Sequence, residues 1–132
     1  MKITAVSKKY AISTDTLRYY ERVGIIPPVT RDENGYRDFS EYDLNWVYFA
    51  KAMRNAGVSV EALIEYGLLF RQGREETLEA RRTILLEQRN ILEQRIQEMQ
   101  NTLTLLEYKL EGNPEHLRAF EKKLEKERQL EE

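Results

Sequence analysis

Apolar side chains recur at helical spacing in two short segments near the start of the chain, residues 3–10 and 14–23. The apolar residues that share one face are Ile3, Val6 and Tyr10 in the first segment, and Leu17, Tyr20 and Val23 in the second. Ser13 is a good N-cap for the second segment, and Gly24 suits the left-handed residue that ends a helix. Two short helices joined by a turn of about three residues are typical of a helix-turn-helix.

The opposite face of residues 14–23 carries hydroxyls, guanidiniums and a phenol. Such groups hydrogen-bond to base edges in the major groove of DNA and to the flanking phosphates, so this segment is predicted to be a DNA-recognition helix. The DNA contacts expected from it are Thr14, Thr16, Arg18, Tyr19 and Tyr20. We expect Tyr20 to bury its ring and to direct its hydroxyl to a phosphate. Asp15 would repel phosphate, and we expect it to cap its own helix.

Pro27 and Pro28 stop the recognition helix and start an extended segment. Residues 29–39 have Asn34-Gly35 at their centre, the strongest short signal for a β-hairpin with a type I′ turn, in which both turn residues have positive φ. Two such short strands are not stable alone, so we expect the hairpin to lean on the helices as a wing. The wing residues expected to contact phosphate are Arg31, Tyr36 and Arg37.

Two further helices are predicted after the wing. Ser40 and Asp43 form a capping box for the first, and Ser59 caps the second. Arg54 stands near the C-terminal end of the first helix, where a cation complements the helix dipole, and it is also a candidate phosphate contact. The aromatic residues of this region, which we interpret as core and packing residues rather than as a ligand cage, are Trp46, Tyr48 and Phe49.

From about Glu75 the apolar residues follow a seven-residue repeat. The positions of this seam are Leu78, Leu85, Leu92, Ile96, Met99, Leu103, Leu106 and Leu110. Arg82 and Arg89 interrupt its first half. At ~1.5 Å per residue, such a helix is too long to leave one apolar seam unpaired, so the seam predicts a coiled-coil homodimer. Asn113-Pro114 then restarts a charged helix with a thin apolar stripe.

These patterns predict an all-α fold with a small β-hairpin wing. A winged helix-turn-helix domain is expected over residues 1–71, a long dimerisation helix over residues 75–111, and a helical tail over residues 112–132.

Composition changes this picture little. The chain has 132 residues, no cysteine and one histidine, so we expect no metal site, no cofactor and no enzymatic activity. No apolar run is long enough to cross a membrane and no leader is visible, which favours a cytoplasmic protein without a membrane partner. Residues 1–60 carry nine Lys/Arg and seven Asp/Glu, and the rest carry 12 and 16, a charge difference of the right sign for DNA binding by the first part.

Several short motifs, met in order along residues 1–110, resemble the MerR family. They are Ile3–Val6, Leu17-Arg18-Tyr19-Tyr20-Glu21, Gly24-Ile25, Asn34-Gly35-Tyr36-Arg37 with Phe39-Ser40, and Arg54-Asn55-Ala56-Gly57 followed by the long seam. The segments 51–57 and 61–66 more narrowly resemble the NmlR-like branch of that family, whose members respond to reactive aldehydes and thiol stress.

This resemblance implies a bacterial transcription regulator that binds promoter DNA as a homodimer. Members of the family hold two winged heads apart on an antiparallel coiled coil and bind a pseudo-palindrome in a promoter whose spacer is too long. They activate by bending and untwisting the spacer so that RNA polymerase engages both promoter elements. An effector can supply the few kcal/mol that this deformation costs.

The chain departs from the family pattern at two positions. Ala11 stands where the family commonly has glycine in the helix-turn-helix turn, a modest backbone cost. Ala52 stands where the NmlR-like branch usually has its sensing cysteine, so thiol-based sensing does not carry over and the effector stays open. The alternatives are an effector-free DNA-binding repressor and a coiled-coil adaptor whose head binds another protein.

Overall fold

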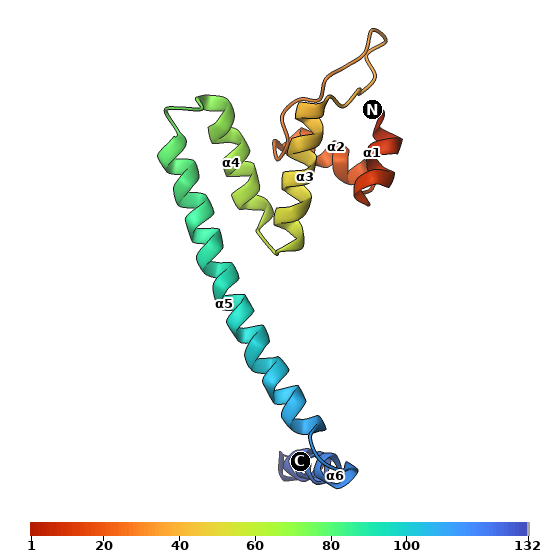
Figure 1. Cartoon of the computed structure of the whole chain (residues 1–132), viewed down its shortest axis with the longest axis vertical. Coiled ribbons are helices and arrows are strands. Elements are labelled where there is room, and N and C mark those ends of the chain that lie inside the picture. Colours follow the sequence, from red (N-terminus) through yellow and green to blue (C-terminus); the bar gives the residue numbers. More distant parts are fainter. Residues whose placement is uncertain (132) are drawn as a thin grey trace. The chain divides into compact units, whose positions relative to one another are not determined.

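The computed structural model describes the backbone of residues 1–131 and the side chains of residues 1–126, and it is mostly helical (Figure 1). Its helices are α1 (Ile3–Tyr10), α2 (Thr14–Val23), α3 (Glu41–Asn55), α4 (Val60–Gln72), α5 (Leu78–Leu110) and α6 (Pro114–Glu131). The chain divides into two compact units, Met1–Leu92 and Glu93–Glu132. The prediction of a helical fold is confirmed; over residues 1–131 the β-structure is limited to isolated bridges.

The two predicted short helices form because local signals end one and begin the other. Ala11 ends α1 in a left-handed conformation (φ 54°, ψ 45°), which costs a non-glycine residue roughly 1–2 kcal/mol. Ser13 caps α2, since its hydroxyl accepts a hydrogen bond from the backbone N–H of Thr16 at 3.1 Å. Gly24 ends α2 with φ 91°, as its position predicts.

The core of the first unit joins α1, α2, α3 and α4. Its most completely buried large side chains are Val6, Leu17, Ile26 and Val47. Two of these, Val6 and Leu17, lie on the predicted apolar faces of α1 and α2. Ile25, Ile26 and Val29 are also buried, so the segment after α2 is part of the core rather than a free linker. Together these side chains hold α2 against the rest of the unit.

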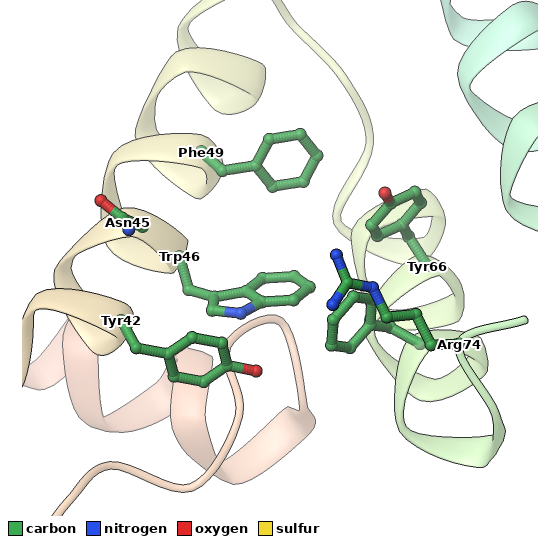
Figure 2. Close-up of a pocket in the computed structure, with 7 residues that line it drawn as sticks. Tyr42, Asn45, Trp46, Phe49, Tyr66 and Arg74 are labelled. Carbon is green, nitrogen blue, oxygen red and sulfur yellow. The ribbon is translucent and has the colours of Figure 1, made fainter.

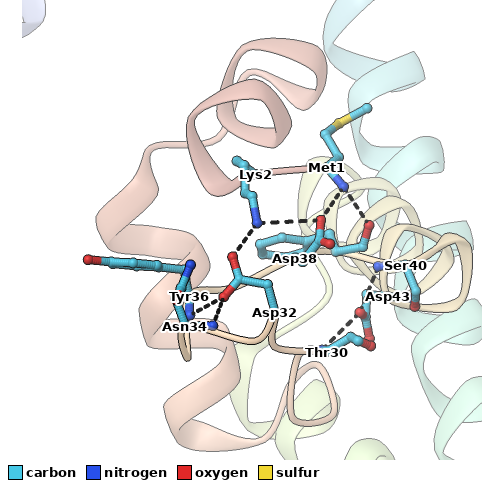
Figure 3. Close-up of polar contacts among 10 residues, drawn as sticks. Met1, Lys2, Thr30, Asp32, Asn34, Tyr36, Asp38, Ser40 and Asp43 are labelled. Atoms are coloured by element: carbon cyan, nitrogen blue, oxygen red, sulfur yellow. Dashed lines mark hydrogen bonds and ion pairs between the residues drawn. The ribbon is translucent and has the colours of Figure 1, made fainter.

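The turn between Arg31 and Arg37 differs from the predicted one. Gly35 has φ 84°, but Asn34 does not have positive φ, so the predicted type I′ turn is wrong. The side chain of Asp32 organises the turn instead: its Oδ1 accepts from the N–H of Asn34 at 2.9 Å (Figure 3). The N–H of Gly35 donates to the carbonyl of Asp32 at 3.0 Å, which leaves glycine alone in the left-handed position of a three-residue loop.

The arms of this loop run antiparallel but are too weakly paired to count as regular strands. Arg31 and Arg37 form one isolated bridge, and Lys2 and Asp38 form another. The N–H of Asp38 also donates to the carbonyl of Thr30 at 2.7 Å. We refer to residues 30–38 as the basic loop.

Asp43 fixes the start of α3 to the basic loop. The predicted capping box is present: Asp43 donates its N–H to the Ser40 hydroxyl, and its Oδ2 accepts from the N–H of Ser40 at 2.9 Å (Figure 3). The same Oδ2 accepts from the N–H of Thr30 at 3.1 Å. Burial alone would raise the pKa of the Asp43 carboxyl, but the hydrogen bonds from Ser40 and Thr30 outweigh it, and the pKa lies below its ordinary value.

The first turns of α5 pack on the first unit, which the seam pattern did not predict. Arg81 and Ile84 are buried, although both lie outside the predicted seam. Thr77, just before the helix, caps the carbonyls of Leu69 and Gly73 at 2.8 and 2.6 Å, which ties the end of α4 to the start of α5. The side of α5 that carries Arg81 and Ile84 is therefore covered by the rest of the first unit.

The predicted seam is largely uncovered in the single chain. Its exposed members are Leu78, Leu85, Ile96, Met99, Leu103, Leu106 and Leu110, and Leu92 is half-buried. In the second unit α6 contacts the end of α5: the rings of Tyr108 and His116 are 5.0 Å apart, and Lys109 Nζ lies 3.8 Å from the Phe120 ring centroid. None of the helices in the described part of the chain has the length and apolarity needed to cross a membrane.

Replacing Asp43 with asparagine should lower the free energy of unfolding at pH 7 by about 1–3 kcal/mol, because charge-assisted hydrogen bonds to two backbone N–H groups are lost. The folded carboxyl has a lowered pKa, so its contribution is complete above the unfolded value of 3.8 and disappears as the pH falls through the folded pKa. The gap between parent and Asp43→Asn should therefore shrink toward low pH in urea unfolding curves. Glu41→Gln, at an exposed position in the same turn, is the control and should show no gap; a gap for Asp43→Asn that is constant with pH would contradict this account.

Candidate nucleic-acid interface

The polar face of α2 lies on the surface of the first unit. Leu17 and Tyr20 point into the core, whereas Arg18 is exposed. The guanidinium of Arg18 pairs with Asp15 Oδ1 at 3.1 Å and reaches Thr14 Oγ1 at 3.4 Å. Asp15 was expected to cap the helix, but it pairs with Arg18 and Ser13 provides the cap. This pairing lays the guanidinium along the outer face of the helix.

The remaining predicted contacts of α2 are partly covered. The hydroxyl of Thr16 accepts from the Ser13 hydroxyl at 2.8 Å, so it belongs to the cap as well as to the surface. Tyr19 is half-buried, with its ring 6.3 Å from the ring of Tyr20 and 5.4 Å from the guanidinium carbon of Arg22. Tyr20 is only 7% exposed, which agrees with the prediction that its ring packs in the core.

Glu21 connects α2 to the basic loop, and the sequence interpretation assigned it no role. Its Oε1 lies 2.7 Å from Arg37 Nε and 3.4 Å from an Arg31 guanidinium nitrogen. Its Oε2 accepts from the N–H of Val29 at 2.6 Å. Arg31 and Arg37 were expected to project from the wing toward phosphate, and in the structure both pair with this carboxylate. The Arg31 side chain is 44% exposed and that of Arg37 is 23% exposed, so Arg31 offers the larger free surface.

A hollow lies between α2 and the basic loop, and four cations and one carboxylate line it. Its volume is ≈ 310 Å³, and the side chains that line it are Lys2, Ile3, Arg18, Arg31, Asp32, Tyr36 and Arg37. The structure thus brings together four predicted contacts, one from α2 and three from the loop. It adds Lys2, which precedes the first helix and gave no signal in the sequence pattern. Tyr36 is 69% exposed at the edge of this group.

Asp32 and Asp38 orient the ammonium of Lys2 and the amino group of Met1 beside the basic loop (Figure 3). Lys2 Nζ lies 2.6 Å from Asp32 Oδ2. This hydrogen bond raises the pKa of the Lys2 ammonium and lowers the pKa of the Asp32 carboxyl. The amino nitrogen of Met1 donates to Asp38 Oδ1 at 2.9 Å, and that contact lowers the pKa of the Asp38 carboxyl. The ammonium of Lys2 therefore stays charged and in place beside the loop.

A second hollow, of ≈ 260 Å³, lies at the N-terminal end of α2. Its polar lining comes from Ser13, Thr16, Tyr20, Lys51, Arg54 and Asn55. The Lys51 ammonium donates to the carbonyl of Tyr10, and the Arg54 guanidinium donates to the carbonyl of Val58 at 2.6 Å. A helix N-terminus beside two cations suits a phosphate group. Arg54 was predicted as such a contact, whereas Lys51 and Asn55 were not, since neither carries a sequence signal of its own.

This arrangement is suited to binding a polyanion rather than to catalysis. The described residues contain no group of His, Asp and Glu side chains that could hold a metal ion. A capped two-helix turn, an exposed polar face on the second helix and a loop that places two arginines beside it define a helix-turn-helix DNA-binding protein.

Comparison with known proteins agrees with this class. The profile of a family described as MerR HTH family regulatory protein matches residues 1–66. The chain belongs to the MerR family of transcriptional regulators.

Among curated relatives, the HTH-type transcriptional regulator AdhR of Bacillus subtilis (strain 168) is 53% identical over 92 residues. That match covers 70% of this chain and 65% of AdhR, so the chain spans just under two thirds of that relative. The HTH-type transcriptional regulator CueR of Salmonella typhi is 31% identical over 101 residues, which cover 76% of this chain and 72% of CueR. Both relatives are transcriptional regulators, not enzymes.

Two solved structures are similar over most of the chain. A protein of Listeria monocytogenes assigned to the MerR family of transcriptional regulators has a TM-score of 0.82 and 44% identity, covering 100% of this chain and 99% of that one. HiNmlR, a MerR family regulator lacking the sensor domain and crystallised on promoter DNA, has a TM-score of 0.76 and 33% identity, covering 83% of this chain and 86% of that one.

Replacing Glu21 with glutamine should weaken binding of a specific DNA duplex about tenfold, because the basic loop loses the charge that holds Arg31 and Arg37 against α2. Fluorescence anisotropy with a labelled duplex measures this. Glu33→Gln removes the same charge from an exposed position of the same loop and is the matched control. If both variants bind DNA more tightly by the same factor, Glu21 acts only through net charge and its positioning role is wrong.

Proposed function

We propose that this chain is a MerR-type regulator that binds a pseudo-palindrome in promoter DNA as a homodimer and activates transcription by distorting the promoter spacer. In this proposal residues 1–71 are the DNA-binding head, with the basic loop as its wing. Residues 75–111 are the dimerisation helix and residues 112–132 are a tail. The partners are double-stranded promoter DNA, a second copy of the chain and RNA polymerase.

The observation that carries the DNA-binding part is the cationic hollow between α2 and the basic loop. Lys2, Arg18, Arg31 and Arg37 converge there although the whole chain has a net charge of −2. Charges gathered on one face bind phosphates and set the register of the duplex, while Thr14, Arg18 and Tyr19 stand where a recognition helix meets base edges. The promoter-bound HiNmlR structure supports the same use of this head.

The exposed seam of α5 supports the homodimer. Leucine, isoleucine and methionine side chains repeat along it, and all of them except the half-buried Leu92 are 40–75% exposed in the single chain. A second copy that pairs antiparallel would cover them and place two heads at a fixed separation, which a pseudo-palindrome requires. Bending and untwisting a promoter site costs a few kcal/mol, and two rigidly connected heads can supply that energy through added phosphate contacts.

The proposed subgroup is the NmlR-like branch without its cysteine. The absence of cysteine excludes thiol alkylation or thiolate metal binding as the signal. That absence also favours a second candidate, an effector-free repressor acting at the same kind of site. Transcription in vitro from the region upstream of the gene distinguishes the two: an activator raises open-complex formation on a promoter with a long spacer, and a repressor lowers it.

The DNA-binding proposal predicts different losses for two arginines. Arg18→Ala should cost about 1–3 kcal/mol on the specific duplex and relax sequence preference, because it removes a contact to a base edge. Arg54→Ala should weaken all duplexes alike and reduce the salt dependence of binding, because it removes a phosphate contact. Competition binding at several salt concentrations measures both. Arg118→Ala, at an exposed position of α6 outside the seam, is the control. Binding without steep salt dependence would favour the protein-adaptor alternative.

The dimer proposal predicts that Leu103→Asp gives a monomer with poor affinity for a two-half-site duplex, because a buried charge in the seam is not tolerated and one head binds only half the site. Sedimentation velocity and anisotropy measure the two effects on one sample. Leu68→Asp changes a leucine that is also about half exposed but lies on α4, outside the seam, and should leave both unchanged. A Leu103→Asp protein that remains dimeric would remove the seam from the proposal.

A further inference from the structure

An aromatic groove lies on the first unit, on the side of α4 that faces α3 (Figure 2). Its volume is ≈ 400 Å³, within the range of sites for small organic molecules. Tyr42, Trp46 and Phe49 of α3, Tyr66 and Phe70 of α4, and Arg74 just beyond α4 line it. We use the name aromatic groove for this set of residues.

The rings of the groove hold one another in place without filling it. The Trp46 ring lies 4.9 Å from Phe70 at an interplanar angle of 77°, and 6.0 Å from Phe49 at 86°. Phe49 lies 5.5 Å from Tyr66. These are edge-to-face and tilted contacts, which leave ring faces free to stack on another molecule. All four rings are only half-buried, although three of them, Trp46, Phe49 and Tyr66, pack on the hydrophobic core.

The positive charges beside the groove favour an anionic ligand. The guanidinium carbon of Arg74 is 5.6 Å from the Phe70 ring, and that of Arg81 is 5.3 Å from the same ring and 5.8 Å from Tyr66. Arg81 is 6% exposed and is held by Thr77 Oγ1 at 3.2 Å and by the carbonyl of Arg74. Two cations already occupy ring faces, and no carboxylate lines the groove, so a cationic ligand would be repelled and an anionic one attracted.

We propose that the aromatic groove binds a small aromatic monocarboxylate. Its ring stacks against Trp46, and its carboxylate pairs with Arg74, whose planar guanidinium matches a carboxylate in two parallel hydrogen bonds. The Tyr42 side chain points toward the groove in Figure 2, and its hydroxyl supplies a further polar group.

The far side of α4 contacts the end of the recognition helix. Arg71 donates to the carbonyl of Gly24 at 3.0 Å, and a Cβ added at Gly67 would collide with that same carbonyl. Tyr66 and Phe70 in the groove are the immediate neighbours of Gly67 and Arg71 in the sequence. A ligand that displaces α4 therefore also displaces the end of α2. The regulatory consequence rests on the proposed function, whereas the binding itself does not.

Trp46 is the single tryptophan of the chain, so its fluorescence reports directly on the groove. Phenylacetate, 2-phenylethanol and phenethylamine carry the same ring with a negative, neutral and positive group. In titrations of the full chain, phenylacetate should change the Trp46 emission with a dissociation constant of roughly 0.1–1 mM, about tenfold tighter than 2-phenylethanol. Phenethylamine should bind most weakly.

Arg74→Gln should remove the tenfold advantage of phenylacetate and leave the affinity for 2-phenylethanol unchanged, which a merely structural role of Arg74 would not do. Arg118→Gln, at an exposed position of α6 outside the groove, is the matched control and should behave as the parent. Equal affinity for the three probes, or an Arg74→Gln protein that keeps the advantage, overturns the proposal. A lack of response to every probe also overturns it, as a groove covered by a second copy would give that result.

Duplex binding measured on the same samples separates this inference from the proposed function. A protein that binds the duplex but not phenylacetate refutes the ligand site alone. A protein that binds phenylacetate but no duplex refutes the proposed function and supports the ligand site. A phenylacetate-saturated protein with altered duplex affinity supports coupling through α4, and unaltered affinity overturns that coupling.

Discussion

The carboxylate of Glu21 is the contact on which the proposed interface depends. It lies at the C-terminal part of α2, is 12% exposed, and accepts from the backbone of Val29 and from the guanidiniums of Arg31 and Arg37. The basic loop has one isolated bridge between its arms, too little pairing to be stable alone. Its position beside α2 therefore comes from Glu21 at one point and from Asp43, which holds Thr30, at another. Both are acidic residues in a region whose proposed partner is a polyanion.

This use of acidic residues explains how a chain of net charge −2 can present a cationic surface. Asp15 and Asp32 contact Arg18 and Lys2 directly, as Glu21 does the loop arginines. Each carboxylate lowers the local positive potential, which reduces non-specific attraction to phosphate. Each also holds the cationic side chains that it contacts in a fixed position. A preorganised guanidinium loses less entropy when it meets a base edge or a phosphate. The arrangement thus favours geometric selectivity over bulk charge, which a count of charges does not capture.

Features that depend on neighbours in the chain were predictable, and those that depend on distant contacts were not. The helix ends at Ser13, Gly24, Ser40 and Ser59 follow from caps that act within three or four residues. The turn at Gly35 was assigned to the wrong type because the Asp32 side chain competes for the same backbone N–H groups as the Asn-Gly pattern. The role of Glu21 depends on Arg37, which is 16 residues away, and the burial of Arg81 depends on the rings of α4. Neither could be predicted from a local sequence pattern.

The helix α4 lies between the aromatic groove and the end of α2. One side supplies Tyr66 and Phe70 to the aromatic groove, and the other meets the carbonyl of Gly24 through Gly67 and Arg71. The last carbonyls of a helix lack partners within the helix, and here one of them is satisfied by a guanidinium from α4. Because Gly67 has no side chain, no flexible group lies between the two backbones to absorb a displacement. Any shift of α4 that follows ligand binding must therefore break the Arg71 hydrogen bond or move α2 with it, and either outcome changes the surface that the proposed recognition helix presents.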